Sequence, residues 1–364
     1  MQNLNEKSWI DKKIPEVFEY VQRGKRLKKS NHILGKIPYI SSKANNNGID
    51  NYIKVTTGTR VFSDCISLAN SGSVGEAFYE PFRYVASDHV TSLKKEGLTP
   101  SQYLFLATTL KKQKDNFNFN REISDRRISN MKILLPTNDA GQPDYSYMEQ
   151  YIINKYNDKK SKYINYLETQ LSVLGKHKNI PSLSEKHWDE FKIFDNILLI
   201  ESTNSGIDEN KLLNVKGKIP YLTRKGATDG TSNGIKKYIS IKNMENGYNT
   251  GNVISIGLDT QTAFYQPFKF ITGQNIQIIS GSKINKYSAM FLIPIIKKQM
   301  DAKFNWGGNG ATLSRMKSLK VLLPINDNGN IDWQYMEQYS KNMIIKKYTQ
   351  YLNFINAKGI DNNE

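Results

Sequence analysis

Residues 35–39 read GKIPY, and residues 217–221 repeat the same five letters. Three further blocks recur in the same order: AFYEPF at 77–82 returns as AFYQPF at 263–268, LLP at 134–136 returns at 322–324, and YMEQY at 147–151 returns at 335–339. The copies lie 182 to 188 residues apart. A repeat of that length is long enough for each copy to bury a core of its own. We therefore expect two tandem copies of one domain.

The composition indicates a polyanionic partner. The 364 residues include 51 Lys and Arg against 34 Asp and Glu, a formal net charge of +17. Such an excess attracts polyanions over about one Debye length, about 8–10 Å at physiological salt. No apolar run approaches the roughly 20 residues that span a bilayer, and the N-terminus lacks an apolar signal core. Nucleic acid is therefore expected and a membrane is not, although a generally basic proteome would also explain the charge.

Cysteine usage bears on the compartment. Cys65 is the only cysteine, so the chain has no internal disulfide framework. Disulfides are rare in reducing compartments. A cytoplasmic location is expected.

Within each copy the pattern predicts a mixed α+β fold of short, mostly antiparallel strands. An Asn-Gly pair, the strongest short hairpin signal, occurs at 47–48 and, as its counterpart, at 233–234. The expected flanking strands are 36–40 with 53–57, and 219–223 with 238–241. Other strands are expected at 60–63, 66–69, 77–79, 131–134, 253–256, 263–265, 276–279 and 319–323. Helices are expected at 100–113 and 285–301, with Pro294 kinking the second or ending it early.

A long amphipathic helix is expected after each copy. Apolar residues recur at spacings of three, four and seven from Asp144 to about Lys178, and again from Asp332 to soon after Ile355. About 30 residues at 1.5 Å each give a rod of roughly 45 Å. Asp144 and Asp332 occupy N-cap positions. The two helices are expected to pack as an antiparallel coiled coil, or else each on its own domain. The residues expected in this packing, or against a partner, are Tyr156, Tyr163, Leu167, Leu171, Met343, Tyr348 and Leu352.

These motifs together resemble the target recognition domains in specificity subunits of type I restriction–modification systems. The resemblance rests on the GKIPY strand, the Asn-Gly-Ile turn, the Phe-Tyr-x-Pro strand, the Leu-Leu-Pro strand and the long helix, carried twice between about Trp9 and Tyr351. The stretch PDYSYME at 143–149 also resembles the specificity subunits of type IIB enzymes, whose partner fuses cleavage and methylation in one chain. The expected division is recognition domain 1 at 1–143, a central helix at 144–180, recognition domain 2 at 181–331, and a C-terminal helix and tail at 332–364.

The resemblance implies a noncatalytic subunit whose two domains each read one half of a bipartite DNA target. The expected partners are double-stranded DNA, adenine-N6 methyltransferase subunits that dock on the long helices, and a restriction subunit. No cofactor is expected in this chain. S-adenosylmethionine, Mg²⁺ and ATP would be bound by the partner subunits.

Comparison of the two copies separates scaffold from variable loops. The repeated blocks are rich in apolar, Gly and Pro residues, whereas the polar loops differ: 41–46 against 223–232, 57–60 against 243–252, and 116–127 against 305–315. Cations hold phosphates, and Arg, Asn, Gln, Ser and Thr read base edges. Ordinary surface drift is the alternative, and the loops at 71–75 and 256–260 could offer N–H groups to phosphate or be plain turns. The candidate DNA-contacting residues are Ser42, Lys43, Asn45, Asn46, Arg60, Ser71, Ser73, Asn118, Asn120, Arg121, Arg126 and Arg127 in the first copy, and Arg224, Lys225, Thr231, Ser232, Asn233, Thr260, Gln261, Asn305, Trp306, Asn309, Thr312 and Arg315 in the second.

No catalytic motif stands out in the sequence. It contains neither an Asp/Asn-Pro-Pro-Tyr/Phe motif nor a Gly-x-x-x-x-Gly-Lys-Ser/Thr loop. Four scattered histidines and one cysteine give no zinc spacing. A nuclease motif could be assembled only from 143–144 and 190–192, and the second copy lacks the matching Glu-x-Lys. A single-chain DNA-modifying enzyme, or an inhibitor that binds restriction partners without DNA, are the open alternatives.

Overall fold

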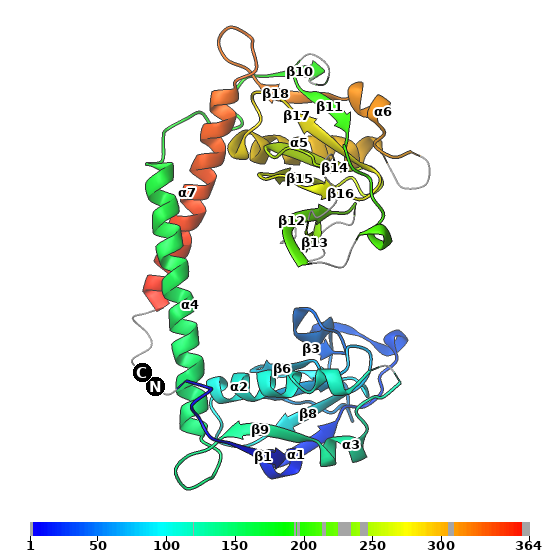
Figure 1. The fold of residues 1–364 in the computed structure, drawn as a ribbon, viewed down its shortest axis with the longest axis vertical. Helices are drawn as coiled ribbons and strands as arrows, with labels where there is room; N and C mark the ends of the chain where they lie inside the picture. The colour runs from blue at the N-terminus through cyan, green and yellow to red at the C-terminus, as the bar shows by residue number, and fades with distance from the viewer. Residues whose placement is uncertain are drawn as a thin grey trace. The chain divides into compact units, whose positions relative to one another are not determined.

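The computed structural model divides the chain into two compact units, Met1–Ile164 and Asn165–Glu364 (Figure 1). It describes residues 3–118, 120–192, 194, 197–212, 216–224, 234–240, 247–304 and 309–358. The strands of the first unit recur in the same order in the second, as the repeated blocks predict, and both units are mixtures of short strands and helices.

The first unit contains three small sheets. One pairs β1 (Trp9–Lys13) antiparallel with β9 (Lys132–Pro136). The second has the order β2 (Tyr20–Arg23), β8 (Val90–Lys94), β5 (Cys65–Ala69) and β6 (Ala77–Glu80), all antiparallel. The third has the order β4 (Ile49–Ile53), β3 (Leu34–Ile40) and β7 (Val85–Ala86), and its β3–β7 pairing is parallel. The helical elements are α1 (Ile14–Val17), η1 (Lys29–Asn31), η2 (Asn46–Gly48), α2 (Pro100–Lys111), η3 (Lys114–Asn116), α3 (Asp125–Asn130) and the first part of α4 (Tyr145–Leu174). The residues of α4 from Asn165 onward belong to the second unit.

The second unit repeats this topology. Its sheets have the orders β10 (Trp188–Lys192)–β18 (Lys320–Pro324), β11 (Leu199–Ser202)–β17 (Ile276–Ser280)–β14 (Val253–Gly257)–β15 (Ala263–Gln266), and β13 (Ile235–Ile239)–β12 (Lys216–Leu222)–β16 (Ile271–Thr272). Its helical elements are η4 (Glu209–Lys211), α5 (Lys286–Lys303), α6 (Leu313–Lys317) and α7 (Trp333–Lys358). The strand registers correspond pair by pair, so the repeat is structural as well as sequential.

GKIPY has a steric reason to begin with glycine. A Cβ on Gly35 would collide with the backbone of Ile53 in β4, and one on Gly217 would collide with the backbone of Ile239 in β13. Both glycines lie at a register shift, where one residue of the partner strand pairs with two of the GKIPY strand. Only a residue without a side chain allows the strands to approach so closely.

Each unit buries its own hydrophobic core. In the first, side chains of β5 and β8 pack with α2, and they include Ile66, Leu93 and Leu106, which are fully buried. In the second, β14, β17 and α5 supply the equivalent core, including Ile254 and Leu292. Separate cores confirm that one copy is large enough to fold around its own apolar interior.

The predicted hairpin turn at 47–48 is confirmed, but the strand after it starts earlier than expected. Asn46, Asn47 and Gly48 have φ values of 52°, 48° and 73°. The turn lies at the end of the 41–48 connection, and β4 follows it directly at Ile49–Ile53, not at 53–57 as the sequence suggested. Residues 60–63 form only an isolated bridge, through Phe62 and Tyr84. The second turn, at 233–234, lies partly outside the described residues.

A kink or an early end of the helix was expected at Pro294, and the early end does not occur. α5 continues through it to Lys303. Pro294 is exposed, and Met290, whose carbonyl loses its helical donor, is 41% exposed. Water can therefore satisfy that carbonyl, so the proline is tolerated on this side of the helix.

The two long helices begin as predicted and are unequal in length. Asp144 Oδ1 accepts a hydrogen bond from the Tyr147 amide at 2.9 Å, and Asp332 Oδ1 does the same for Tyr335. α4 has 30 residues and α7 has 26. Lys7 forms a 2.8 Å ion pair with Asp144, which fastens the start of α4 to the N-terminal segment.

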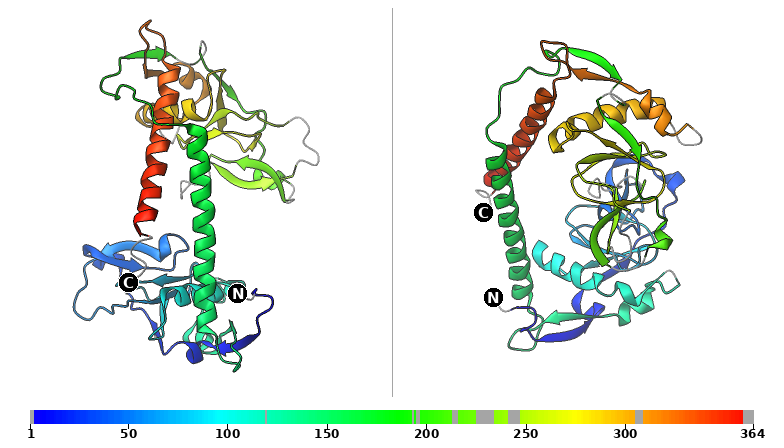
Figure 2. Two further views of the ribbon diagram at one scale, coloured as in Figure 1. Left: turned by 90° about the vertical axis from the view of Figure 1, so that its left-hand side faces the viewer. Right: turned by 45° about the horizontal axis from the view of Figure 1, so that its top comes forward.

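Within the second unit, the end of α4 from Asn165 runs antiparallel to α7 (Figures 1 and 2). Leu167 is fully buried, and the Asn342 side chain of α7 exchanges two hydrogen bonds with the backbone of Lys178, at 3.1 and 2.7 Å. Of the other residues expected in helix packing, Leu171, Tyr348 and Leu352 are half-buried, whereas Tyr156, Tyr163 and Met343 are exposed. Ile344 and Ile345 of α7 are buried as well.

Candidate nucleic-acid interface

Three loops of the first unit form one continuous surface. The amide of Ser73, in the β5–β6 loop, donates to the Ser42 carbonyl in the β3–β4 turn at 3.1 Å. The amide of Ile123, in the loop after α2, donates to the Asn70 carbonyl at 2.9 Å. These bonds bring together eleven of the candidate residues: Ser42, Lys43, Asn45, Asn46, Ser71, Ser73, Asn118, Asn120, Arg121, Arg126 and Arg127.

The second unit places its loops in the same way. The amide of Ala311 donates to the Leu258 carbonyl at 3.1 Å, which matches the Ile123–Asn70 bond. The Thr260 hydroxyl donates to the Arg224 carbonyl and so ties the β14–β15 loop to the end of β12. The described candidates on this surface are Arg224, Thr260, Gln261, Asn309, Thr312 and Arg315. The remaining candidates lie outside the described residues: Lys225, Thr231, Ser232, Asn233, Asn305 and Trp306.

Matched positions on the two surfaces carry different chemistry. The carbonyls of His89 and Asn275 accept equivalent backbone bonds, at 2.8 and 3.0 Å. In the first unit Ser71 Oγ bonds His89 Nδ1 at 2.5 Å, whereas in the second the Asn275 side chain donates to Asp259 at 3.2 Å. Asp259 also pairs with Arg224 at 2.7 Å. The backbone frame is shared, and the exposed donors and acceptors are not.

Three arginines surround a hollow beside α3. It is lined by Gln113, Asn116, Phe117, Arg121, Ser124, Arg126, Arg127, Asn130, Met131 and Lys132. Arg127 Nη1 donates to the Glu122 carbonyl at 2.6 Å, which holds the loop. The guanidinium groups of Arg121 and Arg126 make no hydrogen bond or ion pair with the described part of the chain. An exposed arginine fork fits a phosphate or the edge of guanine.

Several candidate side chains are engaged in holding the loops. Ser71 is only 5% exposed, and its hydroxyl is hydrogen-bonded to His89. Lys43 pairs with Asp50, and Arg60 donates to the Arg23 carbonyl at 2.9 Å. Arg315 donates to the Gly310 carbonyl at 3.0 Å. These bonds hold the loops of the surface in position.

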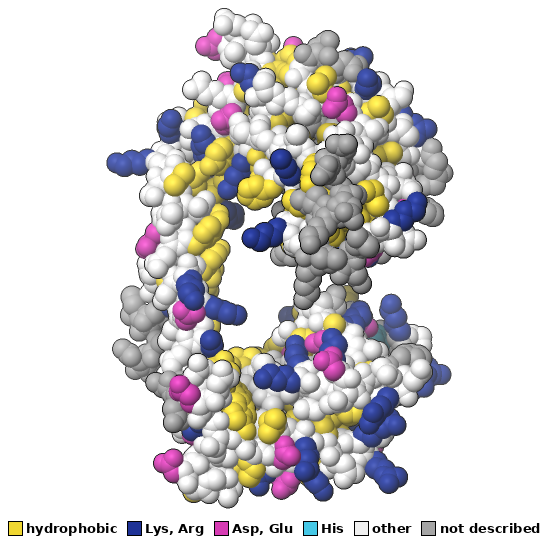
Figure 3. All heavy atoms as spheres, in the orientation of Figure 1, with side chains coloured by type: hydrophobic (Ala, Val, Ile, Leu, Met, Phe, Trp, Pro, Cys, Tyr) yellow, Lys and Arg dark blue, Asp and Glu magenta, His cyan; other side chains and the backbone are white. Residues whose placement is uncertain are grey.

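The candidate set omits a basic segment at residues 25–29. Lys25, Arg26, Lys28 and Lys29 are all exposed. The segment reads KRLKK, and this run of cations is the signal that marks it in the sequence. In Figure 3, Lys and Arg side chains gather on the side of the lower unit that faces away from α4.

Cys65 in β5 and Glu80 in β6 are buried ionisable groups of the four-stranded sheet in the first unit. Burial raises the pKa of the Cys65 thiol to about 11 and the pKa of Glu80 to about 7. Glu80 accepts a 2.9 Å hydrogen bond from Ser67 Oγ. A thiol with a raised pKa is a poor nucleophile at neutral pH, so Cys65 is suited to packing.

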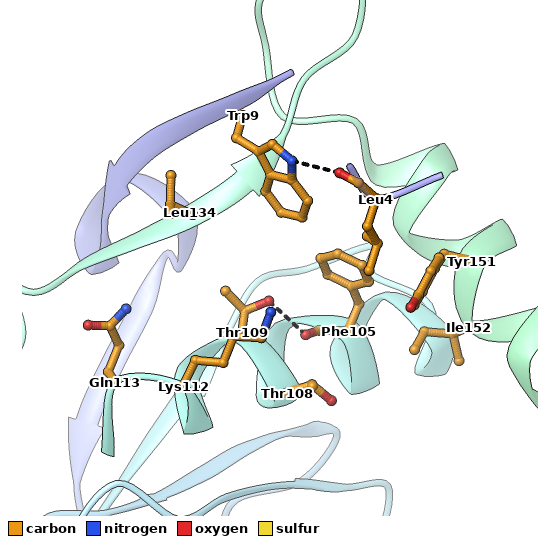
Figure 4. Close-up of a pocket in the computed structure, with 10 residues that line it drawn as sticks. All are labelled: Leu4, Trp9, Phe105, Thr108, Thr109, Lys112, Gln113, Leu134, Tyr151 and Ile152. Atoms are coloured by element: carbon orange, nitrogen blue, oxygen red, sulfur yellow. Dashed lines mark hydrogen bonds between the residues drawn. The ribbon is translucent and has the colours of Figure 1, made fainter. Parts of the chain in front are cut away.

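An apolar pocket of the first unit lies between the N-terminal segment, α2, β9 and the start of α4. None of the candidate residues lines it. It is lined by Leu4, Trp9, Phe105, Thr108, Thr109, Lys112, Gln113, Leu134, Tyr151 and Ile152 (Figure 4). Trp9 Nε1 donates to the Leu4 carbonyl at 3.1 Å, and Trp188 repeats this bond with Leu183 at 3.0 Å. In the second unit Trp188 also stacks on Phe291, with ring centroids 6.2 Å apart.

Neither a metal-binding cluster nor a membrane-spanning helix occurs among the described residues. No three His, Cys, Asp or Glu side chains among them are grouped to hold a metal ion. None of the described helices has the length and apolar character needed to cross a membrane.

Comparison with known proteins agrees with the repeated architecture. Residues 6–168 and 185–353 match the type I restriction modification DNA specificity domain. A curated relative, the S.BcgI specificity subunit of a type II restriction enzyme from Heyndrickxia coagulans, is 32% identical over 159 residues, which are 43% of this chain and 46% of the relative. The solved type I restriction–modification S subunit from M. genitalium has a similar fold, with a TM-score of 0.50 and 15% identity over 99% of this chain and 95% of the other. The chain therefore belongs to the type I restriction–modification DNA specificity family, with two copies of the family's domain.

Proposed function

We propose that this chain is the noncatalytic, sequence-specific DNA-binding subunit of a restriction–modification complex. Each domain reads one half of a bipartite target. The long helices recruit adenine-N6 methyltransferase subunits, and a restriction subunit completes the complex. S-adenosylmethionine, Mg²⁺ and ATP are brought by those partners.

The observation that carries this proposal is the pairing of matched scaffolds with unmatched loops. Equivalent backbone bonds, Asn70–Ile123 and Leu258–Ala311, hold loops in the same place in both domains. The side chains on those loops differ in charge and in hydrogen-bonding capacity. Two readers of different half-sites need a shared frame and different base-contacting groups.

Recruitment by the helices is supported by their exposed apolar side chains. Tyr156 is 65% exposed and Val173 is 74% exposed. Large apolar groups on an otherwise polar helix are typical of surfaces that contact another protein.

A type II system is the second candidate. The curated relative is a subunit of a type II restriction enzyme. In that version one partner chain carries both cleavage and methylation. Co-expression of this chain with the products of neighbouring genes, followed by native mass spectrometry, distinguishes one fused partner from separate methyltransferase and restriction subunits.

Selection of duplexes from a random pool tests the DNA-reading function. The full chain with its co-purified partners should enrich a motif of two short defined elements separated by an unspecified spacer. Enrichment of a single uninterrupted element would contradict reading by two domains. No enrichment, together with intact partner binding, would support an inhibitor that acts without DNA.

A turnover assay tests the absence of catalysis. The purified chain alone, incubated with duplex DNA and either S-adenosylmethionine or a divalent metal, should neither methylate nor cleave it. Turnover that survives further purification would identify a single-chain enzyme.

A further inference from the structure

The segment before the three-stranded sheet has opposite charge in the two domains. In the first domain residues 25–29 read KRLKK, and in the second the matching residues 205–209 read SGIDE. Four cations in one copy are thus replaced by two carboxylates, Asp208 and Glu209, in the other.

Both segments are anchored by the same contact. The hydroxyl of Tyr39 donates to the Leu27 carbonyl at 3.4 Å, and the hydroxyl of Tyr221 donates to the Ile207 carbonyl at 2.6 Å. A 3₁₀ turn follows in each case, η1 in the first domain and η4 in the second. The charge reversal is therefore a change of side chains on one backbone frame.

The basic segment borders a hollow in the first domain. The hollow is lined by Arg26, Leu27, Lys28, Lys29, His32, Tyr39, Ser41, Ser42, Asp50, Ser87, Asp88 and His89. Of its two carboxylates, Asp50 is already paired with Lys43. The side chains of Arg26, Lys28 and Lys29 make no hydrogen bond or ion pair within the described residues, so their charges are available to an anion. Both ring nitrogens of His32 are buried and have no hydrogen-bond partner among the described residues.

The second domain neutralises the same region internally. Glu209 pairs with Lys236 at 2.9 Å and with Lys237 at 3.6 Å, both on β13. By strand register Lys236 occupies the position of Asp50. In the first domain the cations lie in the segment and the carboxylate lies on the strand, whereas in the second domain the positions are reversed. The strand lysines of the second domain are paired with the carboxylate of its own segment.

We propose that residues 25–29 bind backbone phosphates beside the first half-site, and that the matching residues 205–209 of the second domain do not. This rests on the proposed DNA-reading function. Phosphate contacts fix register and supply affinity without reading sequence. The two matched segments therefore contribute unequally to salt-dependent binding, whereas both domains provide sequence preference.

A segment exchange tests this inference. Residues 25–29 are replaced by SGIDE in the full chain, and binding to a fluorescent duplex of mixed sequence is measured over a range of salt concentrations. The slope of log K against log salt is negative, and each lost phosphate contact lowers its magnitude by about 0.9 for B-DNA. We expect the magnitude of the slope to fall by roughly 2 to 3 and the affinity at physiological salt to fall by about tenfold or more. A second variant, with Lys25, Arg26, Lys28 and Lys29 all changed to Gln, removes the cations without adding carboxylates. It should also lower the magnitude of the slope and the affinity.

The matched control is the reverse exchange. Replacing residues 205–209 by KRLKK should raise the magnitude of the slope and the affinity. In every variant the motif selected from a random pool should stay the same. An unchanged slope in both residue 25–29 variants, or a changed motif, would overturn the phosphate-binding role. If the unaltered chain shows no salt-dependent binding at all, the proposed function fails as well, so the two failures are distinguishable.

Discussion

Glu80 and Gln266 occupy the same place in the two domains, and each shares a hydrogen bond with the serine on the neighbouring strand. Ser67 Oγ donates to Glu80 at 2.9 Å, and Gln266 Nε2 donates to Ser255 Oγ at 2.9 Å. Glu80 is fully buried and Gln266 nearly so. The second Glu80 oxygen has no partner among the described residues. One domain thus uses an amide where the other buries a carboxyl group, which indicates that an uncharged side chain suits this position.

Glu80→Gln should make the protein more stable at pH 8 and leave its stability at pH 5 nearly unchanged. Burial raises the pKa of Glu80 to about 7 from its ordinary value of 4.5. The folded state then holds this proton more tightly than the unfolded state, so the natural chain loses stability as the pH rises from about 4.5 through about 7. The gain at pH 8 should be on the order of 3 kcal/mol. Urea unfolding at both pH values measures it.

The control for this prediction is the opposite substitution. Gln266→Glu should add a second loss of stability over the same pH range, because it buries a carboxyl group in the same environment. Equal effects of Glu80→Gln at pH 5 and pH 8 would contradict a protonated Glu80.

Gly35→Ala and Gly217→Ala should each destabilise their own domain. The added methyl group would collide with the backbone of Ile53 or Ile239, and overpacking of this kind costs typically about 1–3 kcal/mol. Lys36→Ala, at the exposed neighbouring position, should change the free energy of unfolding by less than about 0.5 kcal/mol. Chemical denaturation compares the three variants, and a Gly35 variant as stable as the Lys36 variant would contradict the close strand approach.

Removal of the α4 cap should weaken the start of that helix. Burial opposes ionisation of Asp144, but its hydrogen bonds with Lys7 and the Tyr147 amide hold its pKa below the usual value. Its contribution is therefore present at neutral pH and is lost as the pH falls through the lowered pKa. Asp144→Ala should cost about 1 kcal/mol, the typical loss of an N-cap. Asp144→Asn keeps the cap and should cost less at pH 7, and a larger loss for Asn than for Ala would contradict the capping role.

Leu167→Ala should loosen the helix pair in the second unit. Leu167 is fully buried, and truncation of a buried leucine costs about 2–5 kcal/mol. Val173→Ala on the same helix is the control, because Val173 is 74% exposed. Thermal unfolding of the purified chain should separate the two variants. Similar melting temperatures would show that Leu167 does not support this packing.

Features set by local chemistry could be predicted from the sequence. The Asn-Gly turn, the aspartate caps and the long helices depend on residues close together in the chain. The duplication placed the variable loops between matched scaffold blocks. The duplication is visible in the sequence alone, because the five residues that begin at Gly35 are repeated from Gly217.

Features set by long-range contacts could not be predicted in this way. The parallel pairing of β3 with β7 and the Asn70–Ile123 bond join segments far apart in sequence. The burial of Glu80 and the engagement of Lys43 by Asp50 depend on which strands become neighbours. The charge reversal between residues 25–29 and 205–209 is visible in the sequence, but its meaning depends on the shared anchor provided by Tyr39 and Tyr221.

The most direct test of two-domain reading is a loop exchange followed by mapping of the recognised motif. Residues 116–127 of the first domain are replaced by residues 305–315 of the second, and the full complex is assayed by methylome sequencing in cells. If each domain reads its own half-site, one half of the motif changes while the other half and the spacer stay the same. An unchanged motif in a complex that still assembles and methylates would contradict the claim that these loops read DNA.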